Sequence, residues 1–175
     1  MIPEEPNRCL AVEWVERGNE LYEGGYYEGA IELFDKALES DPSFPKAWYN
    51  KGVALDKLGR YEDAIECYDR TLEIRSDRSD IWDNKGASLG NLARFEDAIE
   101  CFGKALDLDP KNSGAWCNMG SALGSLGNYE EALRCFNQAL EIKPDFEEAR
   151  IEKGRALIRL GRVKEAEDLL FQQER

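Results

Sequence analysis

The chain has 175 residues, 42% of them hydrophobic and 34% charged, a composition typical of a soluble globular protein with one core. Its 36 acidic and 23 basic residues give a net charge of -13, which opposes binding to nucleic acid and to acidic membrane surfaces. Histidine is absent, and with it the usual general base near neutral pH and the commonest zinc ligand.

Residues 1–10 (MIPEEPNRCL) are expected to form a short leader outside the rest of the fold. They contain neither the basic segment nor the apolar segment of a secretion signal, and no apolar run in the chain is long enough to cross a bilayer. We therefore expect a cytoplasmic protein, or a cytoplasmic fragment of one.

From residue 11 onward the chain repeats with a period of 34 residues, most visibly as AWYNKG at 47–52, IWDNKG at 81–86 and AWCNMG at 115–120. The period predicts five units, the last of them truncated. The expected units are 11–44, 45–78, 79–112, 113–146 and 147–175.

Each unit is predicted to contain two amphipathic helices. In the second unit Trp48, Gly52 and Leu55 recur at i, i+4 and i+7, and the same spacing starts again at Ala64. Between the two helices, LGRY, LGNY and LGRV place a glycine where a helix ends in the left-handed conformation. Ala93 takes that place in the third unit, which predicts a strained or differently shaped turn.

A glycine recurs in the middle of the first helix of every unit, although glycine inside a helix costs about 1 kcal/mol relative to alanine. We expect these glycines to let the two helices of a unit cross closely, opposite a recurring alanine. The glycines are Gly18, Gly52, Gly86, Gly120 and Gly154, and the alanines are Ala30, Ala64, Ala98, Ala132 and Ala166. A tryptophan four residues before the glycine is expected to fill the core beside the crossing. These are Trp14, Trp48, Trp82 and Trp116.

Three of the five cysteines, Cys67, Cys101 and Cys135, also lie 34 residues apart. One repeat unit would separate them by about 8 to 10 Å, which is more than a disulfide tolerates. Equally spaced residues along a stack cannot converge on one metal ion either. We expect thiols that fill a helix face, and neither a metal site nor a cofactor.

The pattern W-x2-(K/M)-G-x2-L, followed by A-x3-(F/Y)-x2-A and P, resembles the tetratricopeptide repeat over residues 11–175. The resemblance implies an all-α fold: a right-handed α-solenoid of five stacked helix-turn-helix units, in which the first helix of each unit lines a concave groove. Lys51, Lys85 and Lys153, and likewise Arg17, stand where the family usually has an aliphatic residue, so we expect each ammonium to reach a nearby acid. Arg150 replaces the tryptophan of the last unit, whose second helix, at 163–174, is expected to be a solvated cap.

The resemblance also implies that the groove holds another protein, as an extended peptide or a helix. Asn50, Asn84 and Asn118 follow the tryptophans by two residues, and amide side chains suit pairing with a peptide backbone. The alternative is that they only tie neighbouring helices together, and the sequence does not decide between the two. The predicted groove residues are Asn19, Tyr49, Asn50, Asp83, Asn84, Cys117, Asn118, Arg155 and Arg159.

Charge in the predicted groove differs between its ends. The acids lie in the early units and the two arginines at the far end, which predicts a partner that is basic or neutral at first and then acidic. The acids are Glu16, Glu23, Asp56 and Asp80, and the arginines are Arg155 and Arg159.

The clamp by which tetratricopeptide co-chaperones grip a C-terminal carboxylate does not fit this chain. Asn19 and Asn50 match that motif, but Val15, Asp80 and Asn84 occupy the places of its three basic residues.

Other function classes remain open. Catalysis would depend on Cys117 as a nucleophile or on one of many Asp/Glu pairs as acid and base. No histidine can activate the thiol, and the carboxylates alternate with bases on outward faces, so we expect no enzyme. The chain could instead be the interaction arm of a larger enzyme or signalling protein. Self-association through the ends of the stack is a further alternative.

Overall fold

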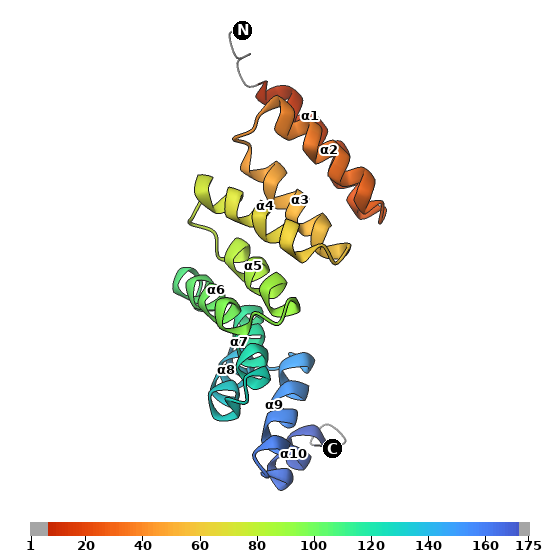
Figure 1. Ribbon diagram of the computed structural model, residues 1–175. Coiled ribbons are helices and arrows are strands. Elements are labelled where there is room, and N and C mark those ends of the chain that lie inside the picture. Colours follow the sequence, from red (N-terminus) through yellow and green to blue (C-terminus); the bar gives the residue numbers. More distant parts are fainter. Residues whose placement is uncertain (1–6, 172–175) are drawn as a thin grey trace. The chain divides into compact units, whose positions relative to one another are not determined.

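The computed structural model describes residues 7–171, without the side chains of residues 170 and 171. Within this part of the chain ten α-helices follow one another and no strand occurs (Figure 1). The helices are α1 (Arg8–Glu23), α2 (Tyr27–Ser40), α3 (Pro45–Lys57), α4 (Tyr61–Ile74), α5 (Ser79–Asn91), α6 (Phe95–Leu108), α7 (Ser113–Ser125), α8 (Tyr129–Ile142), α9 (Glu147–Arg159) and α10 (Val163–Phe171).

Helices α1 and α2, α3 and α4, α7 and α8, and α9 and α10 pack as hairpins, so the predicted all-α fold of helix-turn-helix elements is confirmed. The helices α3, α5, α7 and α9 begin 34 residues apart, in step with the sequence repeat. Helix α1 already begins at Arg8, inside the expected leader, and residues 1–6 lie outside the described residues. Helix α10 has 9 residues where α8 has 14, and residues 172–174 of the predicted last helix also lie outside the described part.

The turn at Ala93 keeps the shape of its glycine counterparts. Gly59 has φ 73° and Ala93 has φ 56°, so both lie in the left-handed region. Arg60 N–H donates to the Leu55 carbonyl at 3.0 Å, and Arg94 N–H donates in the same way to Leu89 at 2.9 Å. Of the two predicted outcomes, strain is the correct one, because an alanine in this region costs roughly 1 to 2 kcal/mol.

The chain forms two compact bodies, each made of several of the 34-residue repeats. From here on, unit 1 means Met1–Ser88 and unit 2 means Leu89–Arg175, and the boundary between them falls within α5. In unit 1, α1 packs on α2, α3 packs on α4, and α3 also packs on both α1 and α2. In unit 2 the same pattern is built from α6 to α10, with α9 packed on both α7 and α8. Each unit is therefore a set of hairpins stacked in chain order.

Gly18, Gly52 and Gly120 face aromatic rings, so the prediction that alanines lie opposite is wrong at these three glycines. A Cβ added to Gly52 would lie 2.8 Å from Cε1 of Tyr68, and one added to Gly120 would lie 2.7 Å from Cε1 of Phe136. Both rings are buried, so they fill the space that a side chain at the glycine would need. The recurring alanine packs one turn further on: Ala132 Cβ is 4.0 Å from a Cβ built on Gly124.

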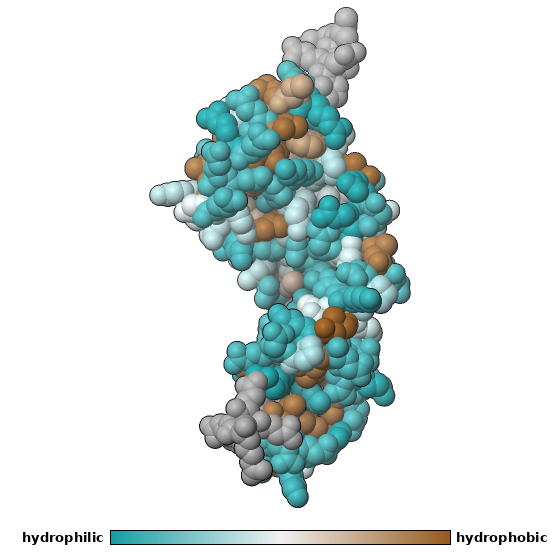
Figure 2. Space-filling view, turned by 180° about the vertical axis from the view of Figure 1, so that it is seen from behind, coloured by the Kyte–Doolittle hydropathy of each residue, from teal (hydrophilic) through white to brown (hydrophobic). Residues whose placement is uncertain are grey.

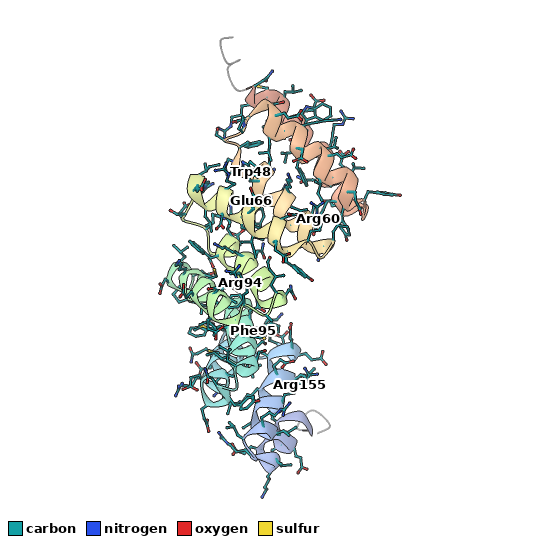
Figure 3. The ribbon with its side chains drawn as sticks, in the orientation of Figure 1. Trp48, Arg60, Glu66, Arg94, Phe95 and Arg155 are labelled. Carbon is teal, nitrogen blue, oxygen red and sulfur yellow. The ribbon has the colours of Figure 1, made fainter. Side chains whose placement is uncertain are left out.

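The tryptophans are only half-buried, so their prediction as core residues is wrong in part. The indole Nε1 of Trp48 donates to the Pro42 carbonyl at 2.9 Å, and that of Trp116 donates to Pro110 at 3.0 Å. Each ring therefore lies over the edge of the core and ties the preceding loop to the helix. Figure 3 labels Trp48 on α3, in unit 1.

Polar residues cover most of the face of each unit that Figure 2 shows, and apolar residues form small separate patches on it. None of the helices in the described range 7–171 has the length and apolarity needed to cross a membrane.

Candidate functional site

Two of the three asparagines link the first helices of neighbouring hairpins in unit 1. Asn50 Nδ2 donates to Asn19 Oδ1 at 2.6 Å, which joins α3 to α1. Asn84 Nδ2 donates to the Tyr49 hydroxyl at 3.0 Å, which joins α5 to α3. These contacts show that the amides tie helices together, and the capacity of the remaining amide atoms to pair with a peptide stays a prediction.

A hollow of about 350 Å³ lies between α1 and α3 in unit 1, and we call it the tyrosine hollow. Its lining is Asn19, Tyr22, Glu23, Phe34, Lys46, Tyr49, Asn50 and Val53. Three predicted groove residues, Asn19, Tyr49 and Asn50, come together here. Two tyrosines and a valine give the hollow an apolar wall that suits the side chain of a bound peptide.

A second hollow of about 350 Å³ adjoins the first, and we call it the basic hollow. Its lining is Arg8, Phe44, Pro45, Lys46, Tyr49, Asn50, Thr71, Arg75, Arg78 and Ile81. The two hollows share Lys46, Tyr49 and Asn50, so they form one continuous surface of unit 1. Sequence reasoning missed its four basic residues, because they occupy four different places in the repeat.

Two of the four acids predicted for the groove are engaged inside unit 1. The carboxylate of Asp56 accepts hydrogen bonds from the Tyr68 hydroxyl at 2.5 Å and from the Ser88 hydroxyl at 2.7 Å. Burial raises the pKa of the Asp56 carboxyl, and these two hydrogen bonds offset part of that rise. Asp80 forms an ion pair with Arg78 at 2.5 Å. Burial also raises the pKa of Tyr49, and the negative charge of Asp80 raises it further.

In unit 2, Arg155 and Arg159 line a hollow of about 200 Å³, which we call the arginine hollow. The lining is Gly120, Ser121, Gly124, Ser125, Tyr129, Phe136, Glu152, Arg155, Ala156 and Arg159. Figure 3 labels Arg155 on α9, and its guanidinium pairs with Glu152 at 2.5 Å. The predicted pair of arginines at the far end of the chain therefore shares one concave surface.

Cys117, Asp83 and Asn118 line none of these three hollows. Cys117 is 1% exposed, so its predicted place at the groove surface is wrong. Burial raises the pKa of its thiol to about 12, with smaller contributions from Glu148 and Glu152, which disfavours the nucleophilic thiolate near neutral pH. Asp83 and Asn118 are half-buried.

Family models described as tetratricopeptide repeat match residues 15–79, 113–146 and 148–170, and one described as TPR repeat matches residues 94–127. The chain belongs to the tetratricopeptide repeat family. No curated relative matches it.

Solved tetratricopeptide structures share its fold at low sequence identity. A crystal structure of MamA superposes with a TM-score of 0.84 at 22% identity, covering 91% of this chain and 87% of that one. MamA 41-end from Desulfovibrio magneticus RS-1 gives 0.87 at 20% identity, with 93% and 92% covered. YrrB, described as a TPR protein with an unusual peptide-binding site, gives 0.78 at 24% identity, with 94% and 88% covered.

Two of the lysines that depart from the tetratricopeptide pattern reach acids, as predicted. Lys51 pairs with Asp35 at 2.6 Å, and Lys85 pairs with Asp69. Each ammonium also lies over the tryptophan three residues before it, 5.7 Å from the ring centroid for Lys51 and 5.6 Å for Lys85. A carboxylate and an indole face together replace the apolar contact of the usual aliphatic residue.

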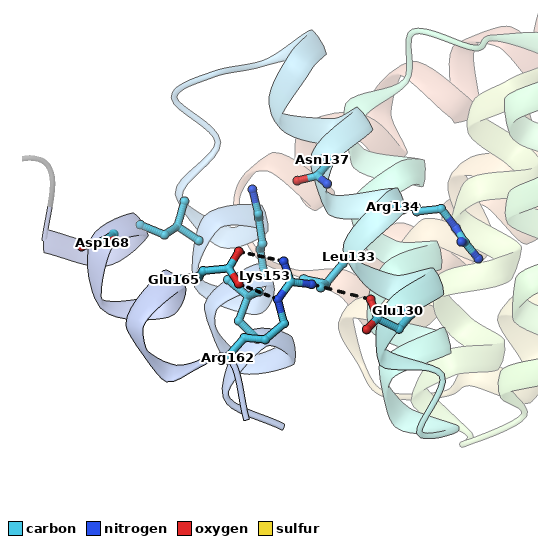
Figure 4. Close-up of a pocket in the computed structure, with 10 residues that line it drawn as sticks. Glu130, Leu133, Arg134, Asn137, Lys153, Arg162, Glu165 and Asp168 are labelled. Atoms are coloured by element: carbon cyan, nitrogen blue, oxygen red, sulfur yellow. Dashed lines mark hydrogen bonds and ion pairs between the residues drawn. The ribbon is translucent and has the colours of Figure 1, made fainter. Parts of the chain in front are cut away.

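The third lysine, Lys153, lacks such a partner, and the prediction is wrong there. Lys153 lies beside Asn137 in a pocket of about 520 Å³ between α8, α9 and α10, which we call the Lys153 pocket (Figure 4). No carboxylate of the described residues lies within ion-pairing distance of its ammonium. Arg162 holds the acids at this place, pairing with Glu165 at 2.7 Å and Glu130 at 3.7 Å.

No disulfide joins the five cysteines, all of which lie in the described part of the chain. Burial raises the pKa of the Cys67 thiol to about 12 and that of Cys135 to about 11, as expected of thiols that fill a helix face. Among residues 7–171, no group of three or more acidic or cysteine side chains is placed to hold a metal ion.

Proposed function

We propose that this tetratricopeptide chain binds a peptide or helix of a partner protein on the concave side of its first helices. The observation that carries the proposal is the continuous surface of the tyrosine hollow and the basic hollow, with an apolar wall beside polar and charged groups. YrrB, a protein of the same fold that is described as having an unusual peptide-binding site, supports the same class of function.

The charge of the proposed partner is inferred separately from the acids and bases that line the hollows of each unit. Glu23 in the tyrosine hollow favours a basic or neutral residue there. Arg155 and Arg159 in the arginine hollow favour an acidic residue or a free carboxylate. Catalysis is not part of the proposal.

Peptides selected on the chain from a displayed random library test the proposal. A selected peptide should lose about tenfold or more in affinity when Tyr49, which lines both hollows, is changed to alanine. Tyr26→Ala is the matched control, because Tyr26 is 67% exposed and lines neither hollow. Equal binding to both variants, each with unchanged helicity, would show that the peptide binds elsewhere.

The asparagines have a test of their own. If their amides pair with the peptide backbone, the folded triple variant Asn50→Ala, Asn84→Ala, Asn118→Ala should lose the selected peptides. If the amides only link helices, the variant should unfold at a lower temperature and bind as before when it is folded.

Self-association is a second candidate, and it is supported by the exposed apolar residues of α9. Ile151 is 39% exposed and Ile158 is 53% exposed, and both lie on α9. A second copy covering these residues would raise the mass measured by light scattering as the protein concentration rises. A monomer mass at every concentration would contradict this candidate.

A further inference from the structure

The basic hollow stands out because the chain as a whole is strongly acidic. Acidic residues outnumber basic ones by 36 to 23, yet the ten lining residues of this hollow include four bases and no acid. The bases are Arg8, Lys46, Arg75 and Arg78. They come from the start of α1, the start of α3 and the segment between α4 and α5, so the fold of unit 1 gathers them.

Two of the four bases already hold carboxylates. Arg78 binds Asp80 through two nitrogens, at 2.8 and 2.5 Å, and Arg75 binds Asp77 through two nitrogens at 3.4 Å. The Arg75 contacts are long, so they are weak hydrogen bonds.

The other two bases have no carboxylate partner among the described residues. The Arg8 guanidinium lies 5.2 Å from the centroid of the Phe44 ring, and no ion pair joins Arg8 or Lys46 to an acid of residues 7–171. Among the described residues that line this hollow or pair with its lining, four positive charges and the two negative charges of Asp77 and Asp80 leave two positive charges. A ligand that brings carboxylates would complete the pairing.

The positive charge of the basic hollow lies next to the apolar wall of the tyrosine hollow. Lys46, Tyr49 and Asn50 line both hollows, so a peptide that crosses them meets the apolar wall and the bases in succession. Glu23 lines only the tyrosine hollow, which keeps acidic side chains away from that part of the surface.

We infer that the basic hollow binds acidic side chains of the partner peptide, next to an apolar side chain that occupies the tyrosine hollow. The inference rests on the proposed function and names the chemistry of its ligand: aspartate or glutamate residues flanking a leucine or an aromatic residue. A nucleic acid is disfavoured, because a long phosphate backbone would also meet the acidic remainder of the surface, whereas a short acidic segment meets the bases alone.

Two pools of fluorescein-labelled short peptides test the inference by fluorescence anisotropy. Both pools carry the same leucine and aromatic positions. One pool has aspartate and glutamate at the remaining positions, and the other has asparagine and glutamine. The acidic pool should bind the wild type about tenfold more tightly than the amide pool, and this preference should weaken as salt is added.

The double variant Arg8→Gln, Lys46→Gln should lose the preference for the acidic pool. The matched control is Lys57→Gln, Arg70→Gln, which removes the same charge from exposed residues of unit 1 that line neither hollow. Its preference should equal that of the wild type.

Equal binding of the two pools to the wild type, or equal loss of the preference in both double variants, would overturn the inference and leave the proposed function in place. Absence of binding by either pool at any concentration would contradict the proposed function, and the inference with it.

Discussion

Helix α3 packs on α2 in unit 1, and α9 packs on α8 in unit 2. At the same place in the repeat, the two contacts differ in the side chains that surround a lysine. In unit 1, Lys51 lies between the Asp35 carboxylate and the Trp48 ring. In unit 2, Lys153 lies beside Asn137 in an open pocket, and an arginine takes the place of the tryptophan. The repeat thus determines where each lysine lies, and the residue 16 positions earlier determines whether it finds a partner.

The largest expected effects concern what the two units share. Gly52→Ala in unit 1 and Gly120→Ala in unit 2 should each destabilise the protein by about 1 to 3 kcal/mol, because the new methyl group would overlap a buried ring. Chemical denaturation followed by circular dichroism measures both.

Gly103→Ala is the matched control for these substitutions. Gly103 lies within α6, and a Cβ there would meet nothing within 4 Å. It should stabilise the protein by up to about 1 kcal/mol, because alanine favours a helix more than glycine does. A loss at Gly103 equal to that at Gly120 would contradict the ring contact as the cause.

A reciprocal exchange of partners tests the contrast between the two lysines. Asp35→Asn should cost about 0.5 to 1 kcal/mol, since Lys51 would keep only the tryptophan, and Asn137→Asp should gain a similar amount by giving Lys153 a carboxylate. Both values are modest because Asp35 is 46% exposed and Asn137 is exposed as well.

Salt provides the control for this exchange. Both changes should shrink as the salt concentration rises, because solvent screens half-exposed ion pairs. A salt-independent gain from Asn137→Asp would point to a packing effect in the Lys153 pocket and would remove the charge argument.

The smallest expected effect concerns Asp56, whose network exists in unit 1 alone. The equivalent places in unit 2 hold Gly124, Phe136 and Ala156, which line the arginine hollow. Burial raises the pKa of Asp56 in the folded state above its ordinary value of 3.8, so folding favours the protonated form. As the pH falls through this raised pKa towards 3.8, the wild type should therefore gain stability relative to Asp56→Asn.

Unfolding free energies of the two proteins, measured side by side across this range, give the difference. Asparagine can accept a hydrogen bond from Tyr68 and donate one to the Ser88 hydroxyl, which then donates to the Asn84 carbonyl. The variant should thus fold normally. A stability difference that does not change with pH would mean that Asp56 has the same pKa in both states.

The fold was predictable because a period of 34 residues with tryptophan, glycine and leucine on one helical face repeats in several units. The residues on one helical face do not show whether the glycine packs against the recurring alanine or against the aromatic residue four positions after that alanine. That distinction depends on how far the two helices slide along each other, which only their packing decides.

The candidate site was predictable in part. Asn19, Tyr49 and Asn50 follow the repeat and do line one hollow of unit 1. Arg8 lies in the expected leader and Arg75 beyond the end of α4, so periodicity could not associate them with Lys46. Cys117 is buried because α9 packs against α7. Glu148 and Glu152 of α9 lie close enough to the Cys117 thiol to raise its pKa, a contact that periodicity alone did not show.

The hydrogen bonds from Trp48 and Trp116 to the loops before their helices make these indoles natural fluorescence reporters. When a loop detaches from its helix, the indole loses both its acceptor and its half-buried environment, and its emission shifts to longer wavelength. A protein that keeps only Trp48 would report the melting of unit 1, and one that keeps only Trp116 would report that of unit 2. The hairpin of α9 and α10 has Arg150 in place of the tryptophan, so it would contribute no indole emission in either protein.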